Sequence, residues 1–239
     1  MQRPPPQYSP DHQWWWDGYQ WHPVGVARAA PGLFWFFETP DWIGPVVLTA
    51  LIGLIPVAGT MVLFGWLLAA RDNVRRGWLA VPPANFSYLE RGVWIVVIAL
   101  VYGLILAAVE AVLIGLLVAV VAAGGSSGVA VMLGVLAGLL FLGWTVVFAY
   151  LLAGLICVTD RYGPGAGFNP ARLWRAAGAN AGNSWKVAGV VYLSSLVVAF
   201  VGAIPVIGWF LLIIAFLATP AIYLNAVPYL ARFDEAKAG

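Results

Sequence analysis

Six apolar stretches follow one another along this chain. They cover residues 43–55, 57–70, 92–123, 129–158, 187–204 and 206–230. A helix that spans a membrane needs about 20 apolar residues. The two central stretches, of about 30 residues each, exceed that length, so they must tilt or extend beyond the hydrocarbon. The first two stretches are short, and we expect either a thin hairpin or a re-entrant pair there.

This pattern predicts an all-α integral membrane protein, a polytopic helical bundle of about six membrane segments. Two short or broken hairpins would flank one long central hairpin. The composition agrees, because 62% of the residues are hydrophobic and only 9% are charged. A soluble domain carries about 25% charged residues to cover its surface. The lipid bilayer is therefore the first partner that we expect.

Two similar breaks divide the outer hairpins. Residues 53–59 read GLIPVAG and residues 202–208 read GAIPVIG, so both fit the pattern GxIPVxG. Proline removes a backbone donor, and glycine permits a tight reversal of the chain. We interpret the pair as an internal repeat of a helical hairpin, with chance similarity as the alternative. The expected helix breaks are Pro56 with Gly59, and Pro205 with Gly208.

Cationic residues lie in the longer connections and are missing from the short ones. The connections at Pro56, at 124–128 (GGSSG) and at Pro205 carry no charge. If every apolar stretch turns back on itself, all 12 Lys and Arg lie on one side of the membrane. The positive-inside rule makes that side cytoplasmic. We therefore expect a multi-pass protein of the cell inner (cytoplasmic) membrane, with both termini in the cytoplasm. The cations of the two long connections are Arg71, Arg75, Arg76, Arg91, Arg161, Arg172, Arg175 and Lys186.

Residues 1–32 form a cytoplasmic Trp-rich leader ahead of the transmembrane domain at 33–239. Asp-Gly between two aromatic runs favours a β-hairpin, because a type I′ turn needs positive φ at both central positions. An isolated hairpin is marginal in water, so we expect it to bind a membrane or cytoplasmic protein. The alternative is an aromatic tail at the membrane interface, where Trp and Tyr collect. The residues of this predicted interaction hairpin are Trp14, Trp15, Trp16, Asp17, Gly18 and Trp21.

The leader resembles short WWWDG-type modules that occur beside membrane segments in actinobacterial and related proteins, through residues 9–11, 14–18, 21 and 23–24. The rest of the chain resembles an uncharacterised prokaryotic multi-pass membrane family, a domain of unknown function. That resemblance covers most of residues 36–231. It implies a helical membrane fold and no established activity, so it assigns no functional residues. The segments that carry it are PDW, IPVAG, FGW, the loop at 81–83, residues 86–92, IPVIG, Pro220 and the PYL at 228–230.

Glu110 is the ionisable residue that lies within a predicted span. A charge near the bilayer centre is costly, so this side chain should face protein or water, or be paired. One interpretation is a proton- or cation-binding site in a permeation route. The other is an interhelical hydrogen-bond clamp with a neutral Glu110. The hydroxyl residues expected at similar depth are Thr49, Thr145, Ser194, Ser195 and Thr219, and the last four complete this candidate polar site.

A short amphipathic helix is predicted before the fifth apolar stretch. Asn169 is a suitable N-cap and Pro170 a suitable first helical residue. The mixture of Arg172, Trp174 and Arg175 that follows suits an anionic lipid surface. A plain linker into the next span is equally consistent with this segment.

Motifs for catalysis are missing. The sequence has no G-x-S-x-G elbow, no H-E-x-x-H and no phosphate loop, so we expect no enzyme, no cofactor and no metal. A net charge of +2 without a basic run argues against a nucleic-acid partner. The leading hypothesis is a non-enzymatic membrane scaffold or interaction module. The alternative is a small transporter or channel that uses Glu110, and the oligomeric state stays open.

Overall fold

The computed structural model of the chain separates into two compact units, Met1–Pro31 and Gly32–Gly239. The boundary lies one residue before the one expected from the sequence. Each unit is described by itself below. The residues that the structure describes are 7–10, 14–16, 21–23, 32–39, 41–202 and 207–234.

The first unit contains three short strands, β1 (Gln7–Tyr8), β2 (Trp14–Trp16) and β3 (Trp21–Pro23). They form an antiparallel sheet in the order β1-β2-β3. Trp16 lies opposite Trp21, and their ring centroids are 5.5 Å apart. Such cross-strand aromatic contacts stabilise a small sheet. Asp17 and Gly18 lie outside the described residues, so the type I′ turn stays a prediction.

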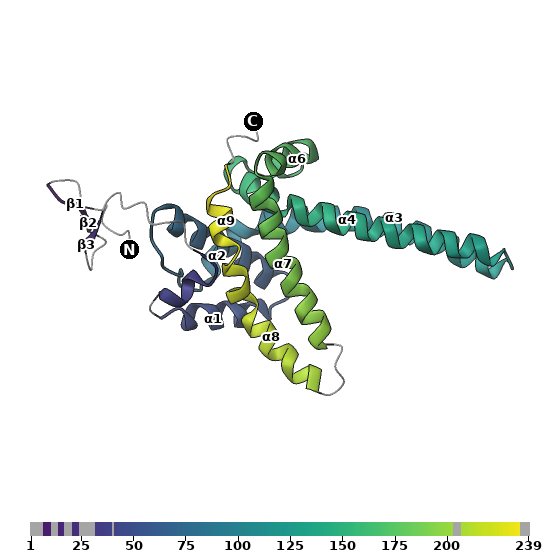
Figure 1. Cartoon of the computed structure of the whole chain (residues 1–239), viewed down its shortest axis with the longest axis horizontal. Coiled ribbons are helices and arrows are strands. Elements are labelled where there is room, and N and C mark those ends of the chain that lie inside the picture. The colour runs from purple at the N-terminus through teal and green to yellow at the C-terminus, as the bar shows by residue number, and fades with distance from the viewer. Residues whose placement is uncertain are drawn as a thin grey trace. The chain divides into compact units, whose positions relative to one another are not determined.

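Helices make up the second unit, and its described residues include no strand. Their arrangement is drawn in Figure 1. In chain order the elements are η1 (Trp35–Glu38), α1 (Ile43–Gly53), α2 (Ala58–Arg75), η2 (Phe86–Tyr88), α3 (Leu89–Ala122), α4 (Ser127–Tyr162), α5 (Pro164–Gly167), α6 (Pro170–Ala179), α7 (Ala181–Gly202), α8 (Ile207–Leu224) and α9 (Val227–Ala231).

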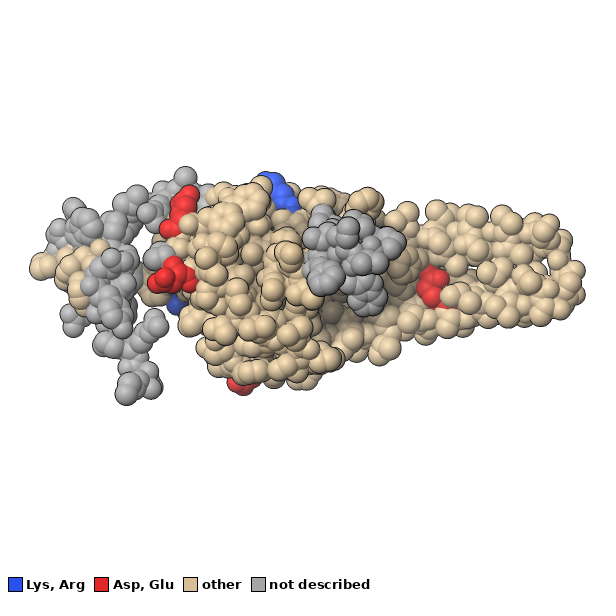
Figure 2. Space-filling model, turned by 90° about the horizontal axis from the view of Figure 1, so that it is seen from below, with Lys and Arg blue, Asp and Glu red and all other residues tan. Residues whose placement is uncertain are grey.

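Three helical hairpins organise this unit: α1 with α2, α3 with α4, and α7 with α8. The α3–α4 pair extends well beyond the other helices, and the α7–α8 pair leaves them in a different direction (Figure 1). We call residues 89–101 and 148–162 the root of the α3–α4 hairpin, and residues 102–147 its distal part. All buried residues of α3 and α4 lie in the root. Figure 2 shows that the distal part is almost free of charged side chains.

Three helical segments among the described residues are long and apolar enough to cross a membrane: Phe86–Ala122, Ser127–Tyr162 and Ile213–Ala231. The expected six segments are therefore not all present at membrane length. α1 has only 11 residues, about half of what a span requires. α2 has 18 residues, but its last turns carry Arg71, Asp72 and Arg75. A hydrophobic run in the sequence therefore overstated the number of full-length helices.

The first GxIPVxG segment separates two helices, and residues 203–206 of the second lie outside the described residues. α1 ends at Gly53 and α2 begins at Ala58, which leaves Pro56 between them. α7 ends at Gly202 and α8 begins at Ile207, while Pro205 lies outside the described residues.

Gly59 and Gly208 do not lie in the interruptions, because each is the second residue of the following helix. A Cβ at Gly59 would overlap the carbonyl oxygen of Ile52. The glycine therefore allows α2 to pack closely on α1. The positive φ of the first break belongs to Val57, at 63°.

The core of the second unit lies around the root of the α3–α4 hairpin, where other helices pack against it. Leu68 of α2, Ile95 of α3 and Leu155 of α4 belong to one buried cluster. A second cluster joins Trp35 and Trp66 to Leu224. The Trp66 indole donates to the Pro82 carbonyl at 2.7 Å, so this large side chain is buried without leaving its N–H unsatisfied.

Candidate functional site

Four charged side chains meet at the root of the α3–α4 hairpin, and we call them the charged cluster: Arg71 and Asp72 of α2, Arg91 of α3 and Asp160 of α4. Nη2 of Arg71 lies 2.6 Å from Oδ2 of Asp160 and 3.0 Å from Oδ1 of Asp72. Nε of Arg91 lies 2.7 Å from Oδ1 of Asp160. Nη2 of Arg91 lies 2.7 Å from Oδ2 of Asp72. Each guanidinium thus contacts both carboxylates, and three helices are joined.

Burial makes this pairing necessary. Arg71 is only 3% exposed, and an unpaired buried charge is strongly unfavourable. Burial of the guanidinium disfavours its charge, but the carboxylates of Asp160 and Asp72 outweigh that effect and raise the pKa of Arg71 above its ordinary value. Arg71 therefore remains a cation in the folded protein. With two cations and two carboxylates, the cluster is electrically balanced.

The chemistry open to this cluster is limited. Asp160 accepts three hydrogen bonds from guanidinium groups, two from Arg91 and one from Arg71. Carboxylates held in this way are ionised and committed to their partners, so they are poor proton carriers. Over the described part of the chain, no group of three or more His, Cys, Asp and Glu could hold a metal ion. The cluster is arranged to hold helices together.

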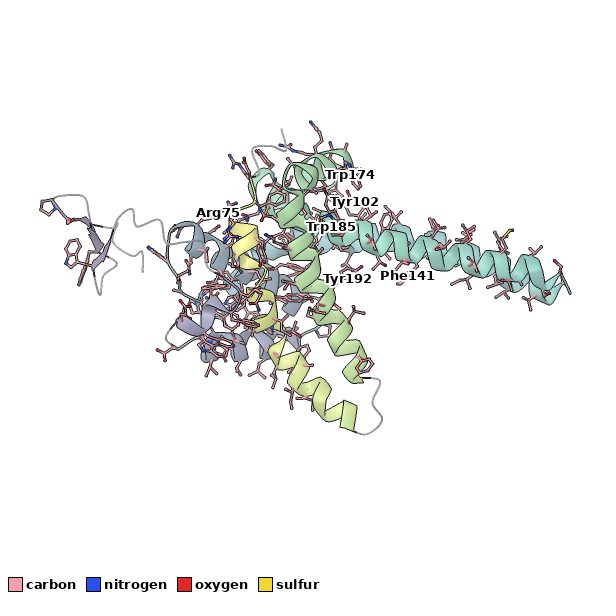
Figure 3. The ribbon with its side chains drawn as sticks, viewed as in Figure 1. Arg75, Tyr102, Phe141, Trp174, Trp185 and Tyr192 are labelled. Carbon is pink, nitrogen blue, oxygen red and sulfur yellow. The ribbon has the colours of Figure 1, made fainter. Side chains whose placement is uncertain are left out.

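A second set of polar contacts fixes the end of the chain to the same region. Arg75, labelled in Figure 3, donates from Nε to the Ala231 carbonyl at 3.0 Å and from Nη2 to the Phe233 carbonyl at 2.8 Å. Ala231 is the last residue of α9, so its carbonyl lacks a partner within the helix, and Phe233 follows two residues later. Asn180 and Asp234 exchange two hydrogen bonds of 3.1 and 2.9 Å. Both contacts join the C-terminal segment to helices far away in the sequence.

The sequence places these arginines on the cytoplasmic side of the membrane. It does not predict the carboxylates and carbonyls that they contact. The signal available was weak: Asp72 and Asp160 are acidic residues inside otherwise basic connections. An acid beside several cations at a helix end is compatible with an ion pair. It does not indicate which helix supplies the partner.

Glu110 lies on α3 in the distal part of the hairpin. Its Oε1 atom is buried and has no hydrogen-bond partner in the described part of the chain. Four of the hydroxyls that were expected to accompany it bond to their own helices instead, whereas Oγ1 of Thr49 is buried and has no partner among the described residues. Thr145 donates to Phe141, Ser194 and Ser195 both donate to Val191, and Thr219 donates to Ala215.

The structure brings two of these residues together with a residue that the sequence did not suggest. Ser194 and Ser195 of α7 lie beside the side chain of Tyr223 on α8. Glu110 forms no hydrogen bond to Thr145 or to either serine among the described contacts. The predicted polar site is therefore divided between two hairpins.

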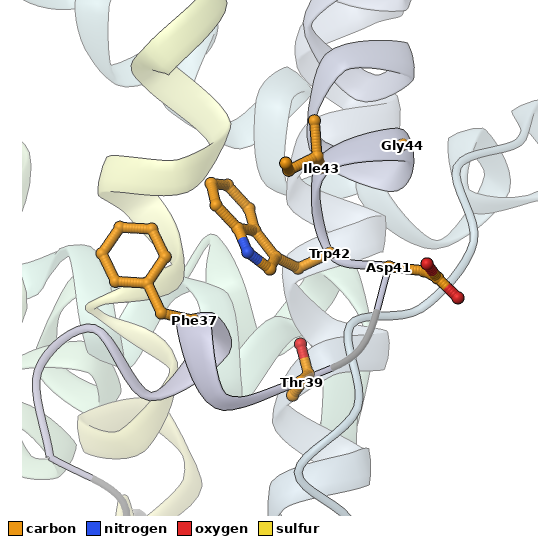
Figure 4. Close-up of a pocket in the computed structure, with 6 residues that line it drawn as sticks. All are labelled: Phe37, Thr39, Asp41, Trp42, Ile43 and Gly44. Atoms are coloured by element: carbon orange, nitrogen blue, oxygen red, sulfur yellow. The ribbon is translucent and has the colours of Figure 1, made fainter.

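Glu110 lines neither of two cavities in the described part of the second unit. The larger, of about 430 Å³, is lined by residues of η1 and the start of α1. Figure 4 shows Phe37 and Trp42 on one side of it, with the Asp41 carboxylate directed away from both rings. The smaller, of about 200 Å³, lies among α3, α4 and α6 and is lined almost entirely by apolar and aromatic side chains.

The helix predicted to begin at Asn169 is present as α6. The Asn169 side chain accepts from the backbone N–H of Arg172 at 3.0 Å, and Pro170 is the first helical residue. This N-cap is confirmed. The Arg172 guanidinium lies over the ring of Tyr162 at 4.2 Å, a cation–π contact that links α6 to the end of α4.

The chain belongs to the DUF4013 family, described as proteins of unknown function, whose family model matches residues 48–207. The match runs from α1 to the start of α8 and includes every residue of the charged cluster. It does not include the Trp-rich leader. No curated protein and no solved structure matches the chain.

We predict that Asp160→Asn destabilises the protein by roughly 3 kcal/mol, because it leaves the buried Arg71 with a single carboxylate partner. Unfolding of the purified protein in detergent, by heat or denaturant, measures the effect. Asp41→Asn is the matched control, since Asp41 is exposed and Asn tolerates its positive φ of 58°. Equal midpoints for the two variants would contradict a structural role of the cluster.

Proposed function

We propose that this DUF4013 protein is a non-enzymatic membrane scaffold or interaction module. Its helical hairpins would be embedded in lipid. The root of the α3–α4 hairpin, with the helix ends packed around it, would form a rigid surface on one side of the membrane, which we call the platform. The observation that carries this proposal is the separation of polar from apolar surface. The ion pairs described at helix ends gather at the roots, whereas the most apolar window of α3 and that of α4 have no buried residue.

The length of the exposed apolar part of α3 supports a location in the bilayer. From Tyr102 to Ala122 α3 extends about 30 Å at 1.5 Å per residue, which equals the thickness of the hydrocarbon core. The remaining length of α3 and α4 would stand outside the hydrocarbon, packed among the other roots. We infer that six segments enter the membrane, with α1 and α2 as a shallow pair.

Charge supports one orientation of this arrangement. Arg71, Arg75 and Arg91 lie at the roots, and the turn between α3 and α4 consists of small uncharged residues. The positive-inside rule then gives a cytoplasmic platform, cytoplasmic termini and a location in the inner membrane of a prokaryotic cell.

We predict that impermeant thiol reagents added outside the cell label a cysteine at Ser126 and not one at Arg76. Both changes are made in a Cys157→Ser background, which removes the only cysteine. Ser126 N-caps α4 at the tip of the hairpin, and Arg76 follows α2 at the root. Permeabilised cells serve as the control for Arg76→Cys. External labelling of that variant in intact cells would overturn the orientation.

The partner surface would include the Trp-rich leader. The ring of Trp21 is about half exposed, and a sheet of three strands with two or three residues each buries little apolar area by itself. Binding to a membrane or cytoplasmic protein would cover it.

We predict that Trp16→Ala with Trp21→Ala reduces the proteins that cross-link to the full-length chain in native membranes several-fold, because it removes the cross-strand ring pair. Quantitative mass spectrometry of the cross-linked products measures the change. Phe86→Ala is the control, since Phe86 is an exposed aromatic outside the leader. Recovery of the same partners in the same amounts from the double variant, and from a chain lacking residues 1–32, would contradict this role.

One observation favours the alternative, a small transporter or channel. The buried and unpartnered Oε1 of Glu110 is an acceptor that a proton or cation could satisfy. A transport pathway also needs polar walls, and the nearby hydroxyls are occupied by their own helices.

We predict that liposomes containing the purified protein conduct protons and alkali cations no faster than empty liposomes. Fluorescent pH and cation indicators measure the flux. Flux in the wild type that Glu110→Gln abolishes, and that Glu90→Gln leaves intact, would replace the scaffold with the transporter. Glu90 is the matched control because it is an exposed carboxylate in the first turn of the same helix.

A further inference from the structure

The smaller cavity, of about 200 Å³, is an apolar cleft at the junction of the root and distal part of the α3–α4 hairpin. Tyr102 of α3 and Trp144 and Leu151 of α4 form one wall, and Leu173 and Trp174 of α6 form the other. The lining exposes almost no polar atoms. A cleft of this kind fits hydrocarbon, and its volume is below the roughly 300–1,000 Å³ typical of complete small-molecule sites. It therefore fits part of an extended chain.

The cleft lies where lipid would meet the packed protein, a placement that rests on the membrane location in the proposed function. On its root side Ile98 and Ala149 are buried. On its distal side Leu142 is 59% exposed. An acyl chain of the adjacent leaflet would thus reach the cleft from the hydrocarbon without crossing a polar region.

Aromatic side chains mark the same level. Tyr150 lies between Trp174 and Trp185, with ring centroids 5.7 and 5.0 Å away. Both tryptophans are about half exposed, at 54% and 53%. Figure 3 shows Trp174, Trp185 and Tyr102 near the root, from which the hairpin continues outward past Phe141. Trp and Tyr collect at the headgroup level of a bilayer.

The chain segment that contains α6, which forms one wall of the cleft, is strongly cationic. Between residues 158 and 191 the only carboxylate is Asp160, which is bonded to Arg71 and Arg91. The cations of this segment are Arg161, Arg172, Arg175 and Lys186. Nε of Arg172 is buried and has no hydrogen-bond partner in the described part of the chain. Groups of Lys and Arg at the cytoplasmic side of membrane helices suit anionic headgroups.

We propose that the cleft binds one acyl chain of an anionic phospholipid, whose phosphate is held by the arginines of α6. Arg172 and Arg175 are three residues apart and so share one face of that helix. Leu173 lies between them in sequence and packs into the cleft. The α6 helix would then act as a bridge, with the lipid chain on its buried side and the headgroup at its basic face.

The test uses the full-length protein in nanodiscs that contain phosphatidylglycerol with a photoreactive group in one acyl chain. Mass spectrometry of the cross-linked protein locates the labelled peptides. We expect labelling concentrated on the residues of α4 and α6 that line the cleft. Leu151→Trp, which fills the cleft, should reduce that labelling several-fold. Leu142→Trp, on the lipid-facing side of the same helix, should leave it unchanged.

A second pair of measurements does not depend on the folding of Leu151→Trp, the variant that fills the cleft. Competition between phosphatidylglycerol and phosphatidylcholine probes measures headgroup preference. Each of Arg172→Gln and Arg175→Gln should lower the preference for phosphatidylglycerol by about fivefold. Arg76→Gln, an arginine at the end of α2, should leave the preference unchanged.

Three results would overturn the inference. They are uniform labelling along α3 and α4, equal labelling of the cleft in the wild type and Leu151→Trp, and equal binding of both headgroups by the wild type. A cleft filled by a second copy, seen as a cross-link between chains at Leu173, would overturn it as well. A protein that does not enter nanodiscs and stays in the aqueous fraction would instead overturn the membrane location itself.

Discussion

The pairing of Asp160 with Arg71 and Arg91 is the contact on which the rest of the helical unit depends. It joins α4 to α2 and α3 at the level where their buried surfaces meet. Burial of apolar side chains does not fix the register of one helix against another. In lipid it also gives no driving force for helices to associate. A balanced set of buried charges does specify a register, because any shift would leave a charge without its partner. The root of the α3–α4 hairpin is therefore fixed, whereas its distal part contains no buried residue.

Close backbone contact at the same level depends on that register. A Cβ at Gly92 of α3 would overlap the Met61 carbonyl of α2, and one at Gly65 would overlap the Tyr88 carbonyl. Glycine is the residue that permits such approach. Arg91 stands beside Gly92 in the chain, so the ion pair and the backbone contact are aligned together. The small residues of α2 and α3 at this level therefore allow the two helices to pack tightly.

The long hairpin, the break at Pro56 and the N-cap at Asn169 could be read from the sequence, because each depends on local chemistry. The number of helices that are long enough to span a membrane could not be predicted from the sequence. Residues 92–123 are apolar apart from Glu110, yet Ile95 is buried in protein and Leu104 is 67% exposed. A hydropathy scale measures how unfavourable it is for a side chain to contact water. It does not distinguish a side chain buried in protein from one that faces lipid. The partners of Arg71 were hidden as well, since Asp160 lies 89 residues away in the sequence.

The predicted polar site shows why depth along a helix is a poor guide to contact. Thr145 and Ser195 were placed near Glu110 by counting residues, but each bonds to a carbonyl one turn earlier in its own helix. Hydroxyl residues in apolar helices have this partner always within reach. The carboxylate of Glu110 has no such partner, and its Oε1 is left unsatisfied among the described residues, as is Oγ1 of Thr49 on α1. Two helices cannot enclose an aqueous path around it. A transport role would therefore require further walls around the α3–α4 hairpin, whereas a scaffold needs only its apolar surface in lipid and its charged root outside.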